Sequence, residues 1–372
     1  MLWLALKTLF HEKIRLATTL AGIIFSTILT LTQVGMYFGF MRNATTIIRN
    51  ADADIWITSK NIQNFDFANP VPEDKINVAR SFADVAAAER VLLSWGFLKL
   101  ANGGQEQVQI VGYNPDTGRA GPWSMHSGDA RDVKGGRYMI IDKTSEQRLG
   151  RLEPGHTYEL SDRKFKLVGL SRDIKSFTTA PIIFMSYNSA KLFYAPDQAT
   201  FIIVKAREGA DVDAVAGALR KSLKDNDVYT RDGFVYKTIM YWTVQTGMGM
   251  GFFLTALLGV MVGGAIVGQT IYANTMEHIK EFGTLKAMGA RNWDLYKIIF
   301  SQAGISAIIG YVVGVLVILS VKGSIEKVGV TLYLSPNLFA ALFVVMLGTC
   351  FLSAYFSIMK VKSLDPVMVF RT

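Results

Sequence analysis

Long uncharged runs dominate the pattern of hydrophobic and polar positions in this chain. One run covers residues 17–41, and three more lie at 238–276, 298–321 and 328–359. A helix of about 20 apolar residues crosses a lipid bilayer. Each run is long enough for one crossing, so the sequence predicts four transmembrane helices.

The first run lies near the start of the chain, where a secretory signal peptide would also lie. The apolar part of such a signal usually has about 7–15 residues. Here the uncharged run is longer, and no small-residue cleavage site follows it. We therefore expect a retained membrane anchor. Before it, residues 1–15 combine apolar groups such as Trp3 and Phe10 with basic residues. This pattern favours a short helix in the membrane interface over an unstructured basic flank.

The segment at 43–240 has a different periodicity from the uncharged runs. Apolar and polar residues alternate at 54–58, which is typical of a strand, and apolar positions recur along one helical face at 212–223. Strand and helix in alternation predict an α/β domain. A stretch at 112–155 is rich in Gly, Pro, Asp and Asn, which indicates loops over a β-rich insertion at roughly 95–185.

The second run, 238–276, is longer than one crossing and contains seven glycines from Gly247 to Gly268. We expect its outer part to form a stalk. We also expect the glycines to let this helix approach its neighbours closely.

The sequence thus predicts an α-helical membrane protein with four transmembrane helices and a large extracytoplasmic α/β domain, porter-like and with a β-rich insertion. The expected segments are an interfacial helix at 1–15, a first span at 16–42, the α/β domain at 43–240, stalk and second span at 241–276, a cytoplasmic loop at 277–297, a third span at 298–321, a short outer loop at 322–336, a fourth span at 337–359 and a cytoplasmic tail at 360–372.

Composition and charge agree with this topology. Half of the 372 residues are hydrophobic and the mean hydropathy is +0.27, which suits a membrane protein with a sizeable polar domain. Basic residues gather before the first run, between the second and third, and after the fourth: Lys7, Lys13, Arg15, Lys280, Lys286, Arg291, Lys297, Lys360, Lys362 and Arg371. The positive-inside rule then predicts an inner-membrane protein with both termini in the cytoplasm and the α/β domain in the periplasm. The net charge of +9 gives no indication of nucleic-acid binding.

No enzyme signature is present. Gly263–Thr270 has the glycine spacing of a phosphate loop, but Gln269 stands where the loop needs its lysine. The four histidines are dispersed, and the single cysteine, Cys350, excludes an intramolecular disulfide. We therefore predict no catalytic residue, no metal site and no cofactor in this chain.

The predicted spans contain no Asp or Glu, which argues against an ion-driven secondary transporter. Their main polar side chains are Gln33, Gln269 and Gln302. We interpret these glutamines as hydrogen-bonding groups between helices, with substrate contact as the alternative.

The loop between the second and third runs contains Glu281-Phe-Gly-Thr-Leu-Lys-Ala-Met-Gly-Ala290. It resembles the cytoplasmic loop of FtsX/MacB-type ABC transporter permeases, with the pattern Glu-x-Gly-x-Leu-Lys/Arg-Ala-Ile/Met-Gly-Ala. The chain end at 365–371 is similar to the ending of that family, and the segments at 11–16, 20–23 and 33–35 resemble its DevC-like branch in particular. The order of one span, a large outer domain and three spans also agrees, so the resemblance covers nearly the whole chain.

The resemblance implies that this loop is a coupling helix seated in a groove of a separate cytoplasmic ATPase. Residues 277–288 can form about three helical turns, in which Ile279, Phe282 and Leu285 would offer apolar contacts and the charged side chains would set orientation. The alternative is an ordinary solvated loop. The candidate coupling residues are Glu277, Lys280, Glu281, Phe282, Gly283, Leu285, Lys286, Ala287 and Gly289.

The resemblance also implies partners. Two permease copies, most simply a homodimer, would assemble with ATPase subunits that bind ATP and Mg. A periplasmic adaptor and a TolC-like outer-membrane channel would complete an exporter of lipids, glycolipids or other hydrophobic compounds, driven by mechanical motion of the periplasmic domain. One alternative is a permease for efflux of haem or hydrophobic toxins. Another is an FtsX-like regulator of an extracytoplasmic hydrolase that transports nothing.

Overall fold

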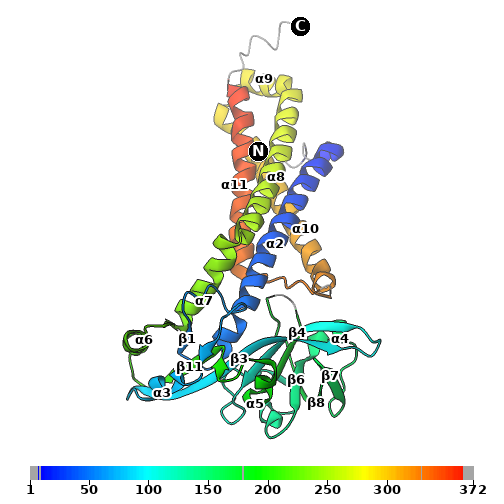
Figure 1. Ribbon diagram of the computed structural model, residues 1–372. Coiled ribbons are helices and arrows are strands. Elements are labelled where there is room, and N and C mark those ends of the chain that lie inside the picture. Colours follow the sequence, from blue (N-terminus) through cyan, green and yellow to red (C-terminus); the bar gives the residue numbers. More distant parts are fainter. Residues whose placement is uncertain (1–6, 8–9, 178–179, 328, 363–372) are drawn as a thin grey trace. The chain divides into compact units, whose positions relative to one another are not determined.

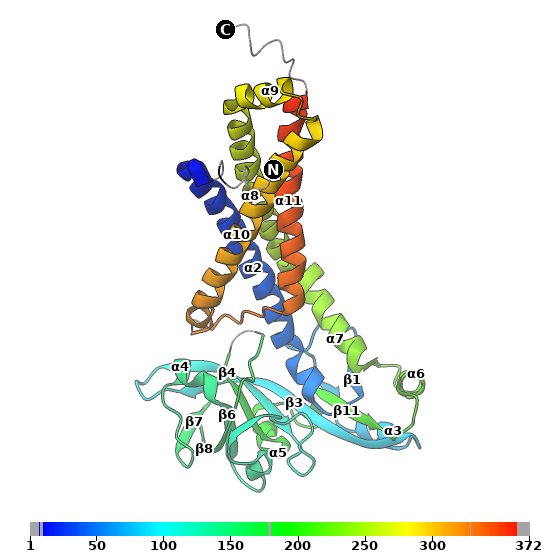
Figure 2. The ribbon, with the colours of Figure 1, turned by 180° about the vertical axis from the view of Figure 1, so that it is seen from behind.

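The computed structural model describes residues 7, 10–177, 180–327 and 329–362 (Figures 1 and 2). The interfacial helix predicted at 1–15 and the tail predicted at 360–372 lie mostly outside these residues. The chain divides into two units, Met1–Gly39 with Gly249–Thr372, which we call the membrane unit, and Phe40–Met248, which we call the α/β unit.

Four helices among the described residues are long and apolar enough to cross a membrane, as predicted. A fifth, short helix lies between the second and third. In chain order these helices are α2 (Lys13–Asn50), α8 (Met248–Glu277), α9 (Ile279–Ala287), α10 (Asn292–Lys327) and α11 (Pro336–Lys362). The helix α2 contributes residues to both units. The helix α10 begins before and ends after the span predicted at 298–321.

Glycines bring α2 very close to α8 and α10. A Cβ atom on Gly263 of α8 would lie 2.5 Å from Cβ of Ser26 on α2. On α10, a Cβ on Gly310 would lie 2.6 Å from Cγ2 of Ile23, and one on Gly314 would lie 2.8 Å from Cβ of Thr27. Real Cβ atoms do not approach neighbours this closely, so these helices pack at a distance that only glycine permits. The prediction of close packing by the glycine-rich run is confirmed.

Polar side chains reinforce the same bundle at α11. The Ser353 hydroxyl donates to the carbonyl of Gly264 on α8 at 3.0 Å, and the Tyr311 hydroxyl of α10 donates to the carbonyl of Phe339 at 2.7 Å. Hydrogen bonds of this kind satisfy polar groups that lipid cannot solvate.

A ten-stranded sheet forms the centre of the α/β unit, in the order β12-β1-β11-β3-β4-β9-β6-β8-β5, with β7 paired to β3 and β8. Its strands are β1 (Ile55–Ser59), β3 (Val85–Lys99), β4 (Gln105–Tyr113), β5 (Met125–Ser127), β6 (Tyr138–Asp142), β7 (Thr157–Leu160), β8 (Arg163–Ser171), β9 (Ile182–Ser186), β11 (Phe201–Ala206) and β12 (Asn226–Thr230). A separate pair joins β2 (Val71–Pro72) and β10 (Gln198–Ala199).

The long strand β3 divides the α/β unit into two lobes. Its first half, up to Val91, pairs with β11, and its second half, from Leu92, pairs with β4. The first lobe therefore holds β12, β1 and β11, and the second holds β4 to β9. The second lobe lies in the part of the sequence predicted as a β-rich insertion.

Short helices connect and cover the strands of the α/β unit. The α-helices are α3 (Lys75–Arg80), α4 (Glu146–Leu149), α5 (Tyr187–Ala190), α6 (Val212–Ser222) and α7 (Arg231–Met240), and the 3₁₀ helices are η1 (Ala130–Val133), η2 (Lys143–Ser145) and η3 (Lys191–Phe193). The Asp211 carboxylate caps α6 by accepting from the N–H of Asp213 at 3.0 Å. The apolar face predicted for this helix is buried at Val215, Ala216 and Leu219.

Aromatic side chains fill the interior of the first lobe. The Trp56 ring lies 5.4 Å from that of Phe201 and 5.6 Å from that of Phe234, and Phe65 stacks on Phe201 at 5.1 Å. All four rings are buried. They come from β1, the segment after it, β11 and α7, so this cluster holds these elements together.

The uncharged run at 238–276 does not form one continuous helix. After α7 comes a turn of π-helix, η4 (Tyr241–Gln245), and then Gly247 with φ of +71°, a conformation that favours glycine. The helix α8 starts at the next residue. The predicted stalk is therefore interrupted rather than a straight extension of the second span.

Candidate functional site

The short helix α9 has defined breaks at both ends. His278 separates it from α8, and Gly289, with φ of +95°, ends it. The N–H of Gly289 donates to the carbonyl of Lys286 at 3.1 Å, and that of Ala290 donates to Leu285 at 3.0 Å, which satisfies the last carbonyls of the helix. In both ribbon views α9 lies across the end of α8 (Figures 1 and 2). The sequence 277–290 thus forms helix, break, helix and turn.

One side of α9 faces its own bundle. Phe282 is only 9% exposed and belongs to the same core cluster as Leu295 and Ile299 of α10, and Leu285 packs against that cluster. We had expected both side chains to contact a partner protein. The structure buries Phe282 in the bundle interior, so its predicted partner contact is wrong, whereas Leu285 is half-buried and its partner contact stays a prediction.

The opposite side of α9 faces outward. Glu281 and Thr284, about one turn apart, are exposed on α9, and Glu277 at the end of α8 and Met288 just after α9 are exposed as well. Lys280 lies beside them and is exposed as well. Met288 is 72% exposed, and Trp293, at the start of α10, is 62% exposed.

Met288 and Trp293 are apolar candidates for partner contact that the sequence reasoning did not single out. Helical spacing did not reveal Met288, because it follows the end of α9 and lies three residues after Leu285; its exposure in the structure does. Gly283 is buried, Lys286 is half-buried, and the side chain of Ala287 lies outside the described part of the structure.

A charge cluster ties α9 to the residues that begin α2. The Glu12 carboxylate accepts from Nε2 of His278 at 2.5 Å and from Nη1 of Arg15 at 2.8 Å. Nδ1 of His278 lies 3.0 Å from Glu281, and Arg15 also pairs with Glu277. The five side chains therefore link the N-terminal segment, the end of α8 and the start of α9. The His278 and Glu12 side chains are about one-fifth exposed.

The cluster changes the acidity of His278. Burial lowers the pKa of His278, but its hydrogen bonds to Glu281 and Glu12 and the negative charges of both carboxylates raise it by more. The net result is a pKa above the ordinary value for histidine. The link between the N-terminal segment and α9 is thus strongest when His278 carries its proton.

The three glutamines predicted in the spans lie in different surroundings. Gln302 is buried and lines a cavity of about 20 Å³ together with Glu12, Arg15 and Ser306, room for about one water molecule. Gln269 is exposed beside an open groove between α8 and α11, and Gln33 is half-buried. The described residues contain no group of three or more His, Cys, Asp or Glu side chains that could hold a metal ion.

Two family profiles match this chain. The profile described as the MacB-like periplasmic core domain matches residues 16–222, which is more than half of the chain. The profile described as the FtsX-like permease C-terminal region matches residues 253–366. The first ends within the α/β unit, and the second covers most of α8 and all of α9, α10 and α11.

Among curated relatives, an uncharacterized ABC transporter permease of Methanocaldococcus jannaschii is 25% identical over 234 residues, which cover 59% of this chain and 58% of the relative. This chain thus spans a little over half the length of that relative. An uncharacterized ABC transporter permease of Mycobacterium tuberculosis is 21% identical over 318 residues, 85% of this chain and 84% of the relative.

Among solved structures, the periplasmic region of MacB from Actinobacillus actinomycetemcomitans is similar at a TM-score of 0.39 and 15% identity, covering 50% of this chain and 94% of that structure. The extracellular domain of YknZ, a noncanonic ABC-type transporter from Gram-positive bacteria, is similar at a TM-score of 0.36 and 12% identity, covering 48% of this chain and 98% of that structure.

Proposed function

Because this chain belongs to the family of ABC transporter permeases with a MacB-like periplasmic core domain and an FtsX-like C-terminal region, we propose that it is the permease subunit of an ATP-driven exporter. In this proposal a separate cytoplasmic ATPase binds ATP and Mg and docks on α9. The motion then reaches the α/β unit, which acts on the cargo outside the membrane. The cargo is a lipid, a glycolipid or another hydrophobic compound.

The arrangement of α9 supports this function best. Its inner side is anchored through Phe282, and its outer side presents Lys280, Glu281 and Met288. A force applied to the outer side would therefore pass to α8 and α10, because a packed interior does not deform easily. The charge cluster would pass the same force to α2, through Glu12 and Arg15.

Further parts of the proposal rest on the sequence. The distribution of Lys and Arg supports a cytoplasmic position for both termini and α9, and a periplasmic position for the α/β unit. Four spans are few for a complete transporter, which supports assembly of two permease copies. The size of the α/β unit favours an adaptor and an outer-membrane channel as partners.

Reversal of charge and loss of apolar surface on the outer side of α9 test the proposal. The double variant Glu281→Lys/Met288→Asp should lower permease-stimulated ATP hydrolysis by about tenfold or more, since both changes fall in the proposed contact. Membrane insertion should stay normal. The measurement is ATPase activity of the permease co-purified with its ATPase from native membranes.

A matched charge reversal, Glu326→Lys at the far end of α10, should leave stimulation unchanged. Full stimulation in the α9 double variant would remove the coupling assignment.

Recovery of an adaptor and enriched lipid in the same purification would support export, whereas recovery of a cell-wall hydrolase without an adaptor would support the regulatory alternative.

A further inference from the structure

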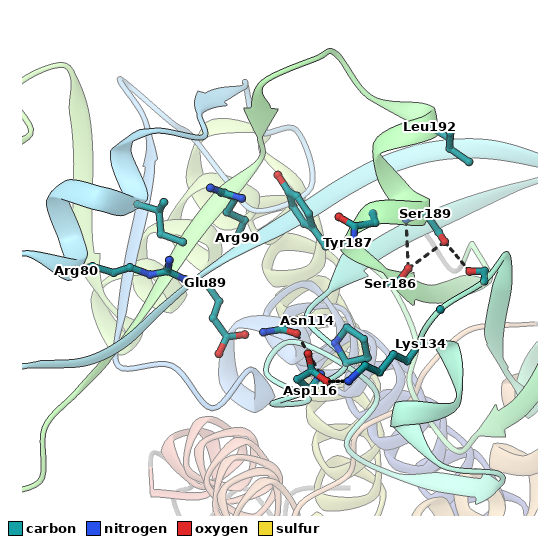
Figure 3. A pocket seen from close by; sticks show the side chains of 15 residues that line it. Arg80, Glu89, Arg90, Asn114, Asp116, Lys134, Ser186, Tyr187, Ser189 and Leu192 are labelled. Atoms are coloured by element: carbon teal, nitrogen blue, oxygen red, sulfur yellow. Dashed lines mark hydrogen bonds and ion pairs between the residues drawn. The ribbon is translucent and has the colours of Figure 1, made fainter.

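The α/β unit contains a polar cleft where its two lobes meet. The cleft has a volume of about 470 Å³. Arg80 of α3 and Arg90 of β3 come from the first lobe, while Asn114, Lys134 and Ser186 come from the second. Figure 3 shows these side chains arranged around one open space, with the two arginines on the side opposite Ser186 and Lys134. A volume of this size suits a small molecule or a headgroup.

The surrounding structure fixes the guanidinium group of Arg80 and leaves a donor of Arg90 without a partner among the described residues. Nε and Nη2 of Arg80 donate to the carbonyl of Ala88 at 3.2 and 2.8 Å, which fixes the plane of the guanidinium group. Nε of Arg90 is buried and has no hydrogen-bond partner among the described residues. A buried donor of this kind calls for a water or a ligand.

Most carboxylates around the cleft are already neutralised by partners. Glu89 accepts from Arg119 at 2.8 Å and from Thr117 at 2.7 Å. Asp116 pairs with Lys134. These carboxylates therefore offer little charge to balance the arginines.

Glu73 contacts two residues that line the cleft, Arg90 and Tyr187, and is shared by two cations. Its carboxylate is 2.9 Å from Nζ of Lys191 and 3.6 Å from Nη1 of Arg90, and it accepts from the Tyr187 hydroxyl at 2.7 Å. Burial raises the pKa of Glu73, but these bonds and charges lower it by more, so the carboxylate is ionised. One carboxylate thus serves Lys191 and Arg90, while Arg80 bonds a neutral carbonyl. The cleft is left with a surplus of positive charge.

We propose that this cleft binds the phosphate ester of a hydroxylated headgroup. This inference deepens the proposed function, because it names the polar part of the exported molecule and rests on that function. Guanidinium groups bind phosphate in a fork of two hydrogen bonds. A tetrahedral phosphate presents oxygens in several directions, which suits cations that approach from opposite sides of the cleft better than a planar carboxylate does. Asn114 and Asn188 supply partners for the hydroxyl groups.

The lining of the cleft also restricts what else can enter. Ile76, Pro115 and Leu192 are its apolar side chains, and the rest are charged, polar or glycine. An acyl chain would leave these polar groups without partners, which is costly. The cleft therefore holds the headgroup and leaves any acyl chain outside.

Calorimetric titration of the purified full-length chain in detergent tests this proposal, with glycerol 1-phosphate as the first probe and dihexanoyl phosphatidylglycerol as the second. Arg90→Gln should weaken binding of both probes by about tenfold or more, because it removes a charged donor. Lys134→Gln is a second variant at an exposed side chain, 65% exposed, where folding is not at risk, and it should weaken binding as well. The control Arg151→Gln removes the same charge from a side chain that is 85% exposed and should bind like the wild type.

Binding of the second probe at least as tightly as the first would identify a lipid headgroup, and binding of the first probe alone or more tightly would identify a soluble phosphate ester. The proposal is overturned if the wild type binds neither probe, or if wild type, Arg90→Gln and Lys134→Gln bind equally. The titration needs no ATPase. Failure of the cleft assignment is therefore distinguishable from failure of the coupling assignment, which the α9 double variant measures.

Discussion

Each of the two units of this protein is held together internally by a different kind of residue. In the α/β unit, the largest side chains lie at the centre, with Trp56, Phe201 and Phe234 fully buried against one another. In the membrane unit, the helices approach one another closely where there is no side chain, as at Gly263 and Gly310.

This difference follows from the solvent around each unit. In water, burial of apolar surface drives folding, so a large aromatic ring contributes most where it is buried. In lipid, helices gain nothing by hiding apolar surface from hydrocarbon, and their association depends on close approach and hydrogen bonds. A change in side-chain volume should therefore have opposite effects in the two units: added atoms should damage the membrane unit, and removed atoms should damage the α/β unit.

Gly310→Leu should have the largest effect. The new Cβ would lie 2.7 Å from Cβ of Ile23, an atom close to the backbone that cannot rotate away, so α2 and α10 must separate. We expect loss of the assembled bundle, measured as a fall in the amount of protease-resistant protein in membranes. Gly323→Leu is the control on the same helix, because a Cβ there meets nothing within 4 Å. Equal damage from both variants would show that helix contacts are not the cause.

Trp56→Ala should have the next largest effect. Removal of a buried ring costs about 3–5 kcal/mol through lost burial and the cavity it leaves. The change is measured by chemical unfolding of the full-length chain, monitored by far-UV circular dichroism, which does not depend on tryptophan fluorescence. The control Tyr236→Ala removes a ring that is 65% exposed and should change the free energy of unfolding by less than about 0.5 kcal/mol. If both variants lowered the free energy of unfolding by similar amounts, the buried contacts of Trp56 would not be what stabilises the first lobe.

The sequence predicted the membrane unit better than the α/β unit, for a physical reason. A membrane span needs some 20 uncharged residues in a row, a strong local signal, and glycine spacing shows which helices approach closely. The predicted fold class is confirmed, but the interruption at Gly247 was not expected. One glycine among seven in that run takes a positive φ, and nothing in the local pattern distinguishes it.

The site was predicted in part. The motif located α9, but it did not show that Phe282 points inward. The local sequence of a short helix with mixed charge does not indicate which of its faces packs against the other helices. The cleft could not be predicted at all. Its residues, from Ile76 to Leu192, come from helices, strands and loops far apart in the chain and share no spacing. Only the pairing of β3 with both lobes brings them together.

Asp66→Asn should sharpen the comparison, because the predicted spans contain no Asp or Glu, whereas the α/β unit buries this carboxyl group. Burial raises the pKa of Asp66 to about 7, against an ordinary value of 3.8, with Gln109 donating to it at 3.4 Å. Between these two pH values the folded chain keeps a proton that the unfolded chain has released. The free energy of unfolding therefore falls as the pH rises through this window, by about 4 kcal/mol, and is then constant.

In Asp66→Asn this fall should disappear, since the amide does not titrate. Unfolding measured at pH 4.5, 6 and 8 gives the comparison. The contribution of Asp66 is refuted if wild type and variant show the same dependence on pH over this range.

His278 should give the smallest effect, because its cluster is partly open to water and screened by it. The raised pKa of His278 means that the proton favours the folded arrangement. Its contribution is complete below the ordinary pKa of histidine and is lost as the pH rises through the higher, folded-state pKa. We expect amide exchange in residues 278–288 to quicken a few-fold over that range, beyond the intrinsic effect of pH, as the tie to Glu12 and Glu281 weakens.

In His278→Gln this additional change should be absent, whereas His156→Gln, at a side chain that is 67% exposed and 3.3 Å from Glu153, should behave like the wild type. Exchange that quickens equally in the wild type and in His278→Gln would show that the anchor of α9 is Phe282 alone. The apolar contact would then hold α9 without help from charge. In that case the membrane unit would depend on close packing even around α9, where its charged residues gather. The difference from the α/β unit would then be larger than the ion pairs of His278 indicate.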